Sequence, residues 1–157
     1  MNYYLGVDIG SINVKIALVD ESGKIEFLAA RKIITSPRAA LNTLIEEVNH
    51  FLITPSIAGI SVSGSGKAII PPEFKWTEYS SSLAIASGLL HTHPDVRTII
   101  QIGGQSSMVI ELDGGLEKPW KVVSNPLCAA GTGRFLEQQS YRLGISIEDF
   151  GDLALRY

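Results

Sequence analysis

The chain has 157 residues, 45% of them hydrophobic, which suits one domain, or one domain and the start of another, around an apolar core. Thirteen basic and sixteen acidic side chains give a net charge of −3, and no basic cluster exceeds Arg31-Lys32, which argues against nucleic-acid binding. No apolar run approaches the ~20 residues of a membrane span, and no signal-peptide pattern is present. A single cysteine excludes an internal disulfide and fits a reducing, cytoplasmic setting.

The predicted elements follow the order β-β-β-α-β-α-β-β-α-α along the chain. Strands are predicted over 3–9, 13–20, 24–34, 57–63, 97–102 and 107–112. Helices are predicted over 37–52, 77–91, 132–143 and 146–157. Ser36 and Ser146 suit the N-cap position, and Gly144 suits a C-cap. Tight turns between the first three strands indicate an antiparallel meander, and the later helix-linked strands favour a mixed sheet with helices on its faces.

A candidate phosphate site lies where the first strand ends, at Asp8-Ile9-Gly10-Ser11, with Lys15 following in the return strand. Asp8 can hold a Mg²⁺-bound water, the backbone N–H groups of the turn can hold phosphate oxygens, and Lys15 can neutralise charge. An ordinary hairpin turn explains the same residues equally well.

Two more glycine turns follow predicted strands. One is Ile102-Gly103-Gly104-Gln105-Ser106-Ser107, which is expected to face the same phosphate chain from another side, and the other is Ser63-Gly64-Ser65-Gly66-Lys67. The sequence has no P-loop and no G-x-G-x-x-G opening a helix, so a dinucleotide-binding Rossmann fold is not indicated. Glu78 is either a catalytic carboxylate near the cleft or a helix N-terminal residue favoured by the helix dipole.

The only cysteine, Cys128, stands immediately before a helical pattern. A thiol at a helix N-terminus feels the positive end of the helix dipole, which favours the thiolate that binds metal or performs redox chemistry. The commoner role of a lone cysteine is that of a small buried hydrophobe.

The run Gly6–Ser11 with Lys15 resembles the first phosphate motif of the actin/Hsp70/sugar-kinase superfamily. Within it, the chain most resembles the activator ATPases of 2-hydroxyacyl-CoA dehydratases and the ATPase subunits of benzoyl-CoA reductase. The resemblance rests on the 63–67 turn, Glu78, the run 98–105 and above all 125–137, which contains Cys128. It spans nearly the whole chain, and the cysteine motif is highly specific.

This resemblance implies an α/β, ribonuclease-H-like ATPase lobe with a mixed five-stranded sheet whose first three strands are antiparallel. Residues 1–125 would form a first lobe, and residues 126–157 a cluster-ligand loop and helices leading towards a second lobe. The implied cofactors are ATP, Mg²⁺ and a [4Fe-4S] cluster shared between the subunits of a homodimer, each giving two cysteines. The implied protein is cytoplasmic and works anaerobically. ATP would drive a low-potential electron, received from a donor such as ferredoxin or flavodoxin, into an acyl-CoA dehydratase or reductase.

Carried onto this sequence, the resemblance gives catalytic roles to Asp8, Lys15 and Glu78 and makes Cys128 the first cluster ligand. The expected nucleotide-binding residues are Gly10, Ser11, Gly64, Gly66, Gly103, Gly104, Gln105 and Ser106.

The sequence departs from the family pattern after the Gly-Gly-Gln triplet, where Ser106 replaces the usual Asp. A hydroxyl in place of a carboxylate weakens hydrolysis more than binding. The second cluster cysteine and the second lobe are expected beyond Tyr157, so the 157-residue chain alone is expected to bind nucleotide weakly or not at all, and to be inactive.

Two other functions fit the same residues. A sugar- or acetate-kinase-type phosphotransferase lobe would consume ATP only with a small substrate and would tolerate loss of Cys128. A degenerate, non-hydrolysing scaffold domain is favoured by Ser106.

Overall fold

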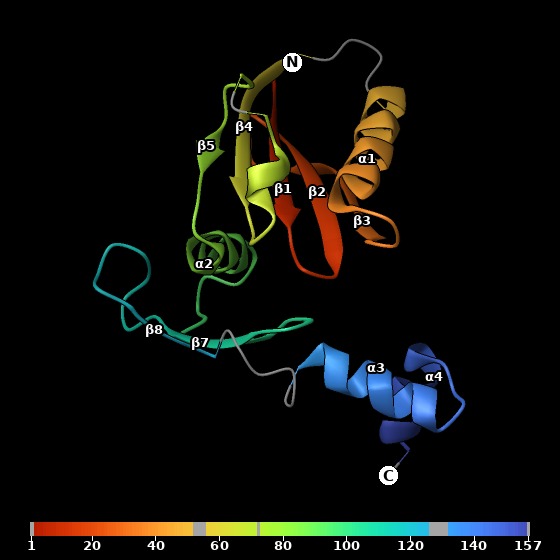
Figure 1. The fold of residues 1–157 in the computed structure, drawn as a ribbon. Coiled ribbons are helices and arrows are strands. Elements are labelled where there is room, and N and C mark those ends of the chain that lie inside the picture. The colour runs from red at the N-terminus through yellow and green to blue at the C-terminus, as the bar shows by residue number, and fades with distance from the viewer. Residues whose placement is uncertain (1, 52–55, 72, 126–131, 157) are drawn as a thin grey trace. The chain divides into compact units, whose positions relative to one another are not determined.

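The computed structural model describes residues 2–51, 56–71, 73–125 and 132–156, which form two compact units, 1–85 and 86–157 (Figure 1). Cys128 lies outside the described residues. The division into a first lobe of residues 1–125 and a cluster-ligand segment of residues 126–157 stays a prediction. The compact units of this chain divide at 85/86.

The first unit is built on a mixed five-stranded sheet with strand order β3-β2-β1-β4-β5. Its strands are β1 (Tyr3–Ile9), β2 (Asn13–Asp20), β3 (Ile25–Lys32), β4 (Ile57–Ser63) and β5 (Thr77–Glu78). The β1–β2 and β2–β3 pairs are antiparallel, whereas β4 runs parallel to both β1 and β5. The predicted mixed sheet, with its first three strands antiparallel, is confirmed.

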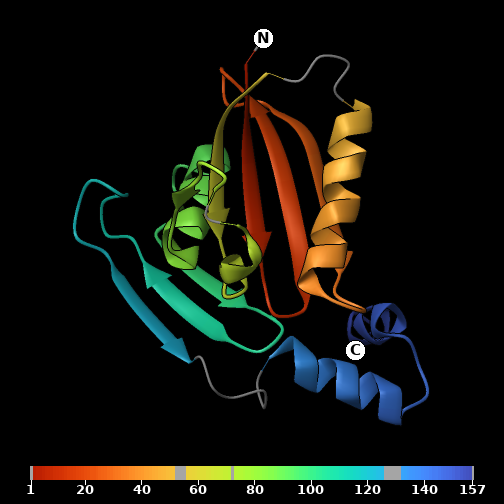
Figure 2. The ribbon, with the colours of Figure 1, turned by 45° about the horizontal axis from the view of Figure 1, so that its top comes forward.

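One face of this sheet carries the core of the unit. Alternate residues of β1 and β2, among them Ile9, Ile16 and Leu18, are fully buried. Helix α1 (Pro37–Phe51) packs on them through Leu44 and its neighbours and lies along the β2 and β3 side (Figures 1 and 2). The helix begins as predicted, because the Ser36 hydroxyl accepts a hydrogen bond from the Ala39 amide at 3.1 Å.

The opposite face has small or polar side chains in the same strands. In the sheet register Gly6 lies between Ala17 and Ser61, and Asp8 lies between Lys15 and Ser63. Because successive residues of a strand point to opposite faces, these side chains share the face that α1 does not cover. This is the face on which the first candidate site is built.

The predicted helix over 77–91 is wrong at its start. Thr77 and Glu78 form the short strand β5, and the helix α2 runs from Ser81 to Thr92. Ser80 follows the strand and caps the helix, because its hydroxyl accepts a hydrogen bond from the Leu83 amide at 3.2 Å. Glu78 therefore belongs to a sheet edge and not to a helix N-terminus.

The second unit contains a separate three-stranded antiparallel sheet, ordered β6-β7-β8. Its elements are β6 (Thr98–Ile102), β7 (Ser107–Glu111), β8 (Lys121–Asn125), α3 (Gly133–Arg142) and α4 (Ile147–Ala154). The sequence did not predict β8. Its residues, Lys-Val-Val-Ser-Asn, do not alternate between apolar and polar, and all five are exposed in the structure. Gly144 has a φ of 69°, as its predicted C-cap role requires. The Ser146 hydroxyl caps α4 by accepting from the Asp149 amide at 3.0 Å.

Among the residues described, no helix is long and apolar enough to cross a membrane.

The two neighbours Leu44 and Ile45 test the packing of α1. Leu44 is fully buried, while Ile45 is 39% exposed. We expect Leu44→Ala to lower the free energy of unfolding by about 3 kcal/mol, since it leaves a cavity against the sheet. Ile45→Ala should cost less than about 1 kcal/mol, because this side chain is already partly in water. Urea unfolding of the two variants measures both values, and equal losses would contradict the observed orientation of α1.

Candidate functional site

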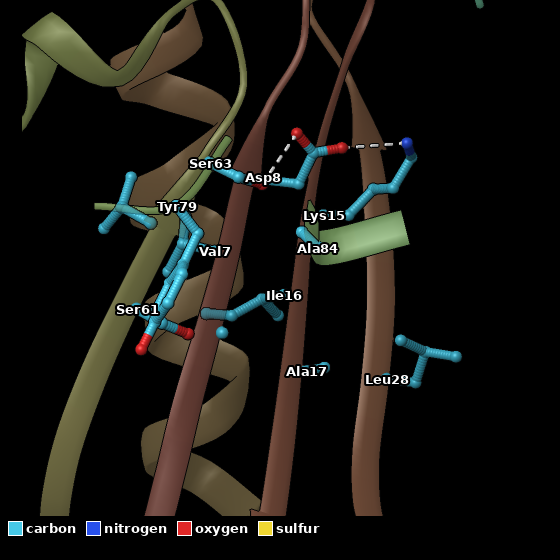
Figure 3. A pocket seen from close by; sticks show the side chains of 12 residues that line it. Val7, Asp8, Lys15, Ile16, Ala17, Leu28, Ser61, Ser63, Tyr79 and Ala84 are labelled. Atoms are coloured by element: carbon cyan, nitrogen blue, oxygen red, sulfur yellow. Dashed lines mark hydrogen bonds and ion pairs between the residues drawn. The ribbon is translucent and has the colours of Figure 1, made fainter. Parts of the chain in front are cut away.

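A pair of opposite charges marks the end of β1. Asp8 and Lys15 face each other across the β1–β2 ladder, and the Lys15 ammonium lies 3.0 Å from a carboxylate oxygen of Asp8 (Figure 3). The two side chains are 35% and 54% exposed, so the pair is open to solvent. An exposed pair contributes only about 0.2–1 kcal/mol. Asp8 and Lys15 can therefore separate and each bind a ligand instead, at little cost in free energy.

The turn after β1 places Gly10 and Ser11 directly beyond this pair. The Gly10 amide donates to the carbonyl of Asn13 at 3.0 Å, which closes the turn, and Ser11 is exposed. The predicted first phosphate loop is thus a tight hairpin turn next to Asp8 and Lys15. A turn of this geometry is expected both for a phosphate loop and for an ordinary hairpin.

The turn after β4 folds back onto the end of β1. The Gly66 amide donates to the Ile9 carbonyl at 2.8 Å. Gly64 has a φ of 94°, and a Cβ added there would lie 2.3 Å from the Ile9 oxygen and 2.7 Å from a carboxylate oxygen of Asp8. Only glycine fits this approach, because an added methyl group would overlap backbone atoms that cannot move aside. The backbone of the turn after β4 is therefore held against Asp8.

Ser63 is a site residue that the sequence did not single out. It is buried, and its hydroxyl lies 3.5 Å from Asp8 Oδ1, on the opposite side of the carboxylate from Lys15 (Figure 3). Its position in the 63–67 turn was visible in the sequence, but its pairing with Asp8 depends on the parallel register of β1 and β4.

A cavity of about 260 Å³ adjoins these residues within the first unit. Its lining includes the small residue Gly6. Ala17, Ser61, Tyr79 and Ala84 line it as well (Figure 3). Beside the charged pair, the small residues leave space for a ligand of modest size, and Leu28 also lines this space.

Glu78 is separate from that cavity lining. Its carboxylate forms an ion pair with Lys67, which begins the short 3₁₀ turn Lys67–Ile69. The pair joins β5 to the glycine turn after β4. A catalytic role for Glu78 stays a prediction.

The remaining predicted nucleotide-binding residues lie in the second unit, at the turn between β6 and β7. The Gly103 amide donates to the Ser106 carbonyl at 2.8 Å, which closes the turn. A Cβ at Gly103 would lie 3.0 Å from the Gln101 side-chain nitrogen and 3.1 Å from the Ser106 oxygen. Gln105 is exposed and Ser106 is half-buried. This turn is a compact backbone loop of the kind that binds anions through N–H groups.

Within the described ranges, no group of three or more His, Cys, Asp or Glu side chains is arranged to hold a metal ion. The predicted metal ligand Cys128 falls in the gap between β8 and α3. A Mg²⁺ ion bound with a nucleotide needs only one or two protein carboxylates, since phosphate oxygens and water complete its shell. Asp8 fits that requirement.

A sequence model of the family described as the BadF/BadG/BcrA/BcrD ATPase family matches residues 5–156. The activator of lactoyl-CoA dehydratase from Anaerotignum propionicum is 32% identical over 96% of this chain and 58% of its own length.

Two solved structures share the fold. The activator of the 2-hydroxyisocaproyl-CoA dehydratase from Clostridium difficile, with bound ADPNP, aligns with a TM-score of 0.81 at 28% identity, over 99% of this chain and 57% of that one. Component A of the (R)-2-hydroxyglutaryl-CoA dehydratase of Acidaminococcus fermentans aligns with a TM-score of 0.84 at 25% identity, over 100% and 60%. The actin/Hsp70-type α/β fold implied by the sequence is confirmed. The chain spans somewhat over half the length of these proteins.

The glycine at position 64 provides a test of the site's backbone. We expect Gly64→Ala to lower the free energy of unfolding by more than about 2 kcal/mol, because it combines a positive φ with a backbone clash. Gly151→Ala in α4 is the matched control: a Cβ there meets no heavy atom within 4 Å, and alanine should stabilise that helix by up to about 1 kcal/mol. Thermal unfolding of both variants decides the matter, and a tolerated Gly64→Ala would disprove the close approach.

Proposed function

The chain belongs to the BadF/BadG/BcrA/BcrD ATPase family, and from this premise we propose that the protein is an ATP-driven activator of an acyl-CoA dehydratase or reductase. The observation that carries the proposal is the juxtaposition of Asp8 and Lys15 beside the Gly64 backbone. It supplies a carboxylate, a cation and a close backbone approach in one place, which are the parts that a Mg²⁺-nucleotide needs. The bound ADPNP of a similar activator supports ATP as the ligand.

In this proposal Asp8 holds a Mg²⁺-bound water and Lys15 turns from Asp8 to a phosphate oxygen. The exposed ion pair is weak enough for this exchange, and the ligand offers each partner a new opposite charge. Gly10, Ser11, Gly64 and Gly66 contribute backbone near the phosphates. In the second unit, Gly103, Gly104, Gln105 and Ser106 are proposed to bind phosphate oxygens of the nucleotide.

Cys128 is proposed as a ligand of a [4Fe-4S] cluster bridging two subunits. Such a cluster stores and passes single electrons at low potential when it is held by four thiolates. One further cysteine from each subunit would complete the set, which makes a homodimer part of the proposal. The electron would come from a donor of the ferredoxin or flavodoxin type and leave for the acyl-CoA enzyme, since similar proteins are named as activators of such dehydratases.

A second candidate function is a scaffold that binds nucleotide without hydrolysing it. The observation in its favour is Ser106, a half-buried hydroxyl at the turn that closes on Gly103. A neutral hydroxyl binds Mg²⁺ more weakly than a carboxylate and is a much poorer base for activating water.

Two variants of the full-length protein, prepared anaerobically, separate the two halves of the proposal. The parent protein should be brown, with about two irons per chain, as one four-iron cluster per dimer requires. Cys128→Ala should lose the iron and the visible absorption but retain ATP binding. Asp8→Asn should retain the iron and lower the rate of ATP hydrolysis on the order of a hundredfold, because Mg²⁺ loses its carboxylate.

Iron analysis, the visible spectrum and phosphate release measure these outcomes. A parent protein that stays colourless after anaerobic reconstitution would rule out the activator. Hydrolysis that needs a small hydroxyl or carboxylate substrate, and that is indifferent to Cys128→Ala, would indicate a phosphotransferase instead.

Ser106→Asp tests the scaffold alternative in the full-length protein. If Ser106 limits hydrolysis, the added carboxylate should raise kcat by about tenfold or more while the Kd for ATP changes little. Ser107→Asp, at the next position in the chain, is the control and should give no gain. An unchanged kcat for Ser106→Asp would contradict the role assigned to this position.

A further inference from the structure

The start of helix α3 is hydrogen-bonded to the glycine turn between β6 and β7. The Gly133 amide donates to the Gly103 carbonyl at 2.9 Å, and the Arg134 amide donates to the Gly104 carbonyl at 3.0 Å. The Thr132 hydroxyl adds a third bond, also to the Gly104 carbonyl and also 3.0 Å long. Figure 2 shows α3 beginning beside this turn. The first donors of α3 are therefore engaged with protein carbonyls.

Thr132 contributes the side-chain hydrogen bond of this contact from a buried position. It is only 2% exposed, although it is polar and stands at the boundary of the helix. The Gly104 carbonyl, which accepts from both Thr132 and Arg134, has both of its lone pairs occupied. A Cβ at Gly133 would lie 3.4 Å from the Gly103 oxygen, an ordinary van der Waals contact, so the approach does not depend on glycine at this position.

These bonds also fix where the next amides point. The described residues contain no cis peptide bond, and in a trans peptide the C=O and the following N–H point in opposite directions. The Gly103 and Gly104 carbonyls point to α3, so the N–H groups of Gly104 and Gln105 point away from it. Within the described part of the chain neither of these amides donates a hydrogen bond. Two successive amides aimed to one side form a small anion-binding concavity.

We infer that Thr132 is a positioning residue for the nucleotide: by holding the Gly104 carbonyl, its hydroxyl aims the amides of Gly104 and Gln105 at a phosphate group. The inference rests on the proposed function, because it takes ATP as the source of that phosphate. It assigns to Thr132 an effect on phosphate binding that acts entirely through the backbone of another residue.

Three variants of the full-length protein test this role, with ADPNP titration and thermal unfolding as the two readouts. Thr132→Val keeps the shape but removes the hydroxyl, and we expect the Kd for ADPNP to rise about tenfold. Thr132→Ser keeps the hydroxyl and should hold the Kd within about twofold of the parent even if packing loss lowers Tm. Ser140→Ala is the matched control, since Ser140 is also buried in α3 and its hydroxyl donates to the Glu137 carbonyl at 3.0 Å. It should lower Tm and leave the Kd unchanged.

The outcomes distinguish the proposed function from the role of Thr132. A parent protein that does not bind ADPNP would overturn the proposed function and this inference with it. A parent that binds ADPNP, together with a Thr132→Val variant that binds it equally well, would overturn the inference alone. If Thr132→Val does not fold, hydrogen exchange of the parent protein decides: ADPNP should slow exchange at the amides of Gly104 and Gln105 by about tenfold or more, and unchanged exchange there would refute the assigned role.

Discussion

The parallel pairing of β1 with β4 is the constraint on which the first candidate site depends. It sets Ser63 opposite Asp8 and delivers the glycine turn after β4 to the end of β1. The buried Ile9 then fixes this turn, because its carbonyl accepts the Gly66 amide at 2.8 Å and its backbone leaves no room for a Cβ at Gly64. Without that pairing, Asp8 and Lys15 would be an ordinary surface ion pair on a hairpin.

The site combines a rigid frame with loosely held charges. The frame is a sheet whose α1-facing residues Ile9, Ile16 and Leu18 are fully buried, so the strand ends cannot shift without disturbing the core. The charges of Asp8 and Lys15 are partly in water and bound to each other by an interaction of little net strength. Such a division suits a site that must accept and release a charged ligand, since the positions are preset and the partners are exchangeable.

The second unit repeats the arrangement of strand, glycine turn and return strand, but its support comes from a helix. Donors of Thr132, Gly133 and Arg134 hold the Gly103 and Gly104 carbonyls, so the geometry of the turn and the start of α3 are set together. The segment that contains Cys128 leads directly into this helix start. Thr132, proposed to position the phosphate-binding amides, thus follows Cys128, the proposed cluster ligand, within a few residues of the chain.

The sequence by itself determined the local features: helix α1 with its Ser36 cap, the Gly144 and Ser146 signals between α3 and α4, and the glycine turns. These follow from helical periodicity and from backbone conformations that particular residues favour, and both are readable over a few neighbours. Only the tertiary structure decided that Glu78 pairs with Lys67 from a two-residue strand too short to show a pattern. It also decided that Ser63 meets Asp8 and that Thr132 holds Gly104, contacts between residues 55 and 28 positions apart. Pairings over such separations depend on which strands and helices become neighbours, and local periodicity does not specify that.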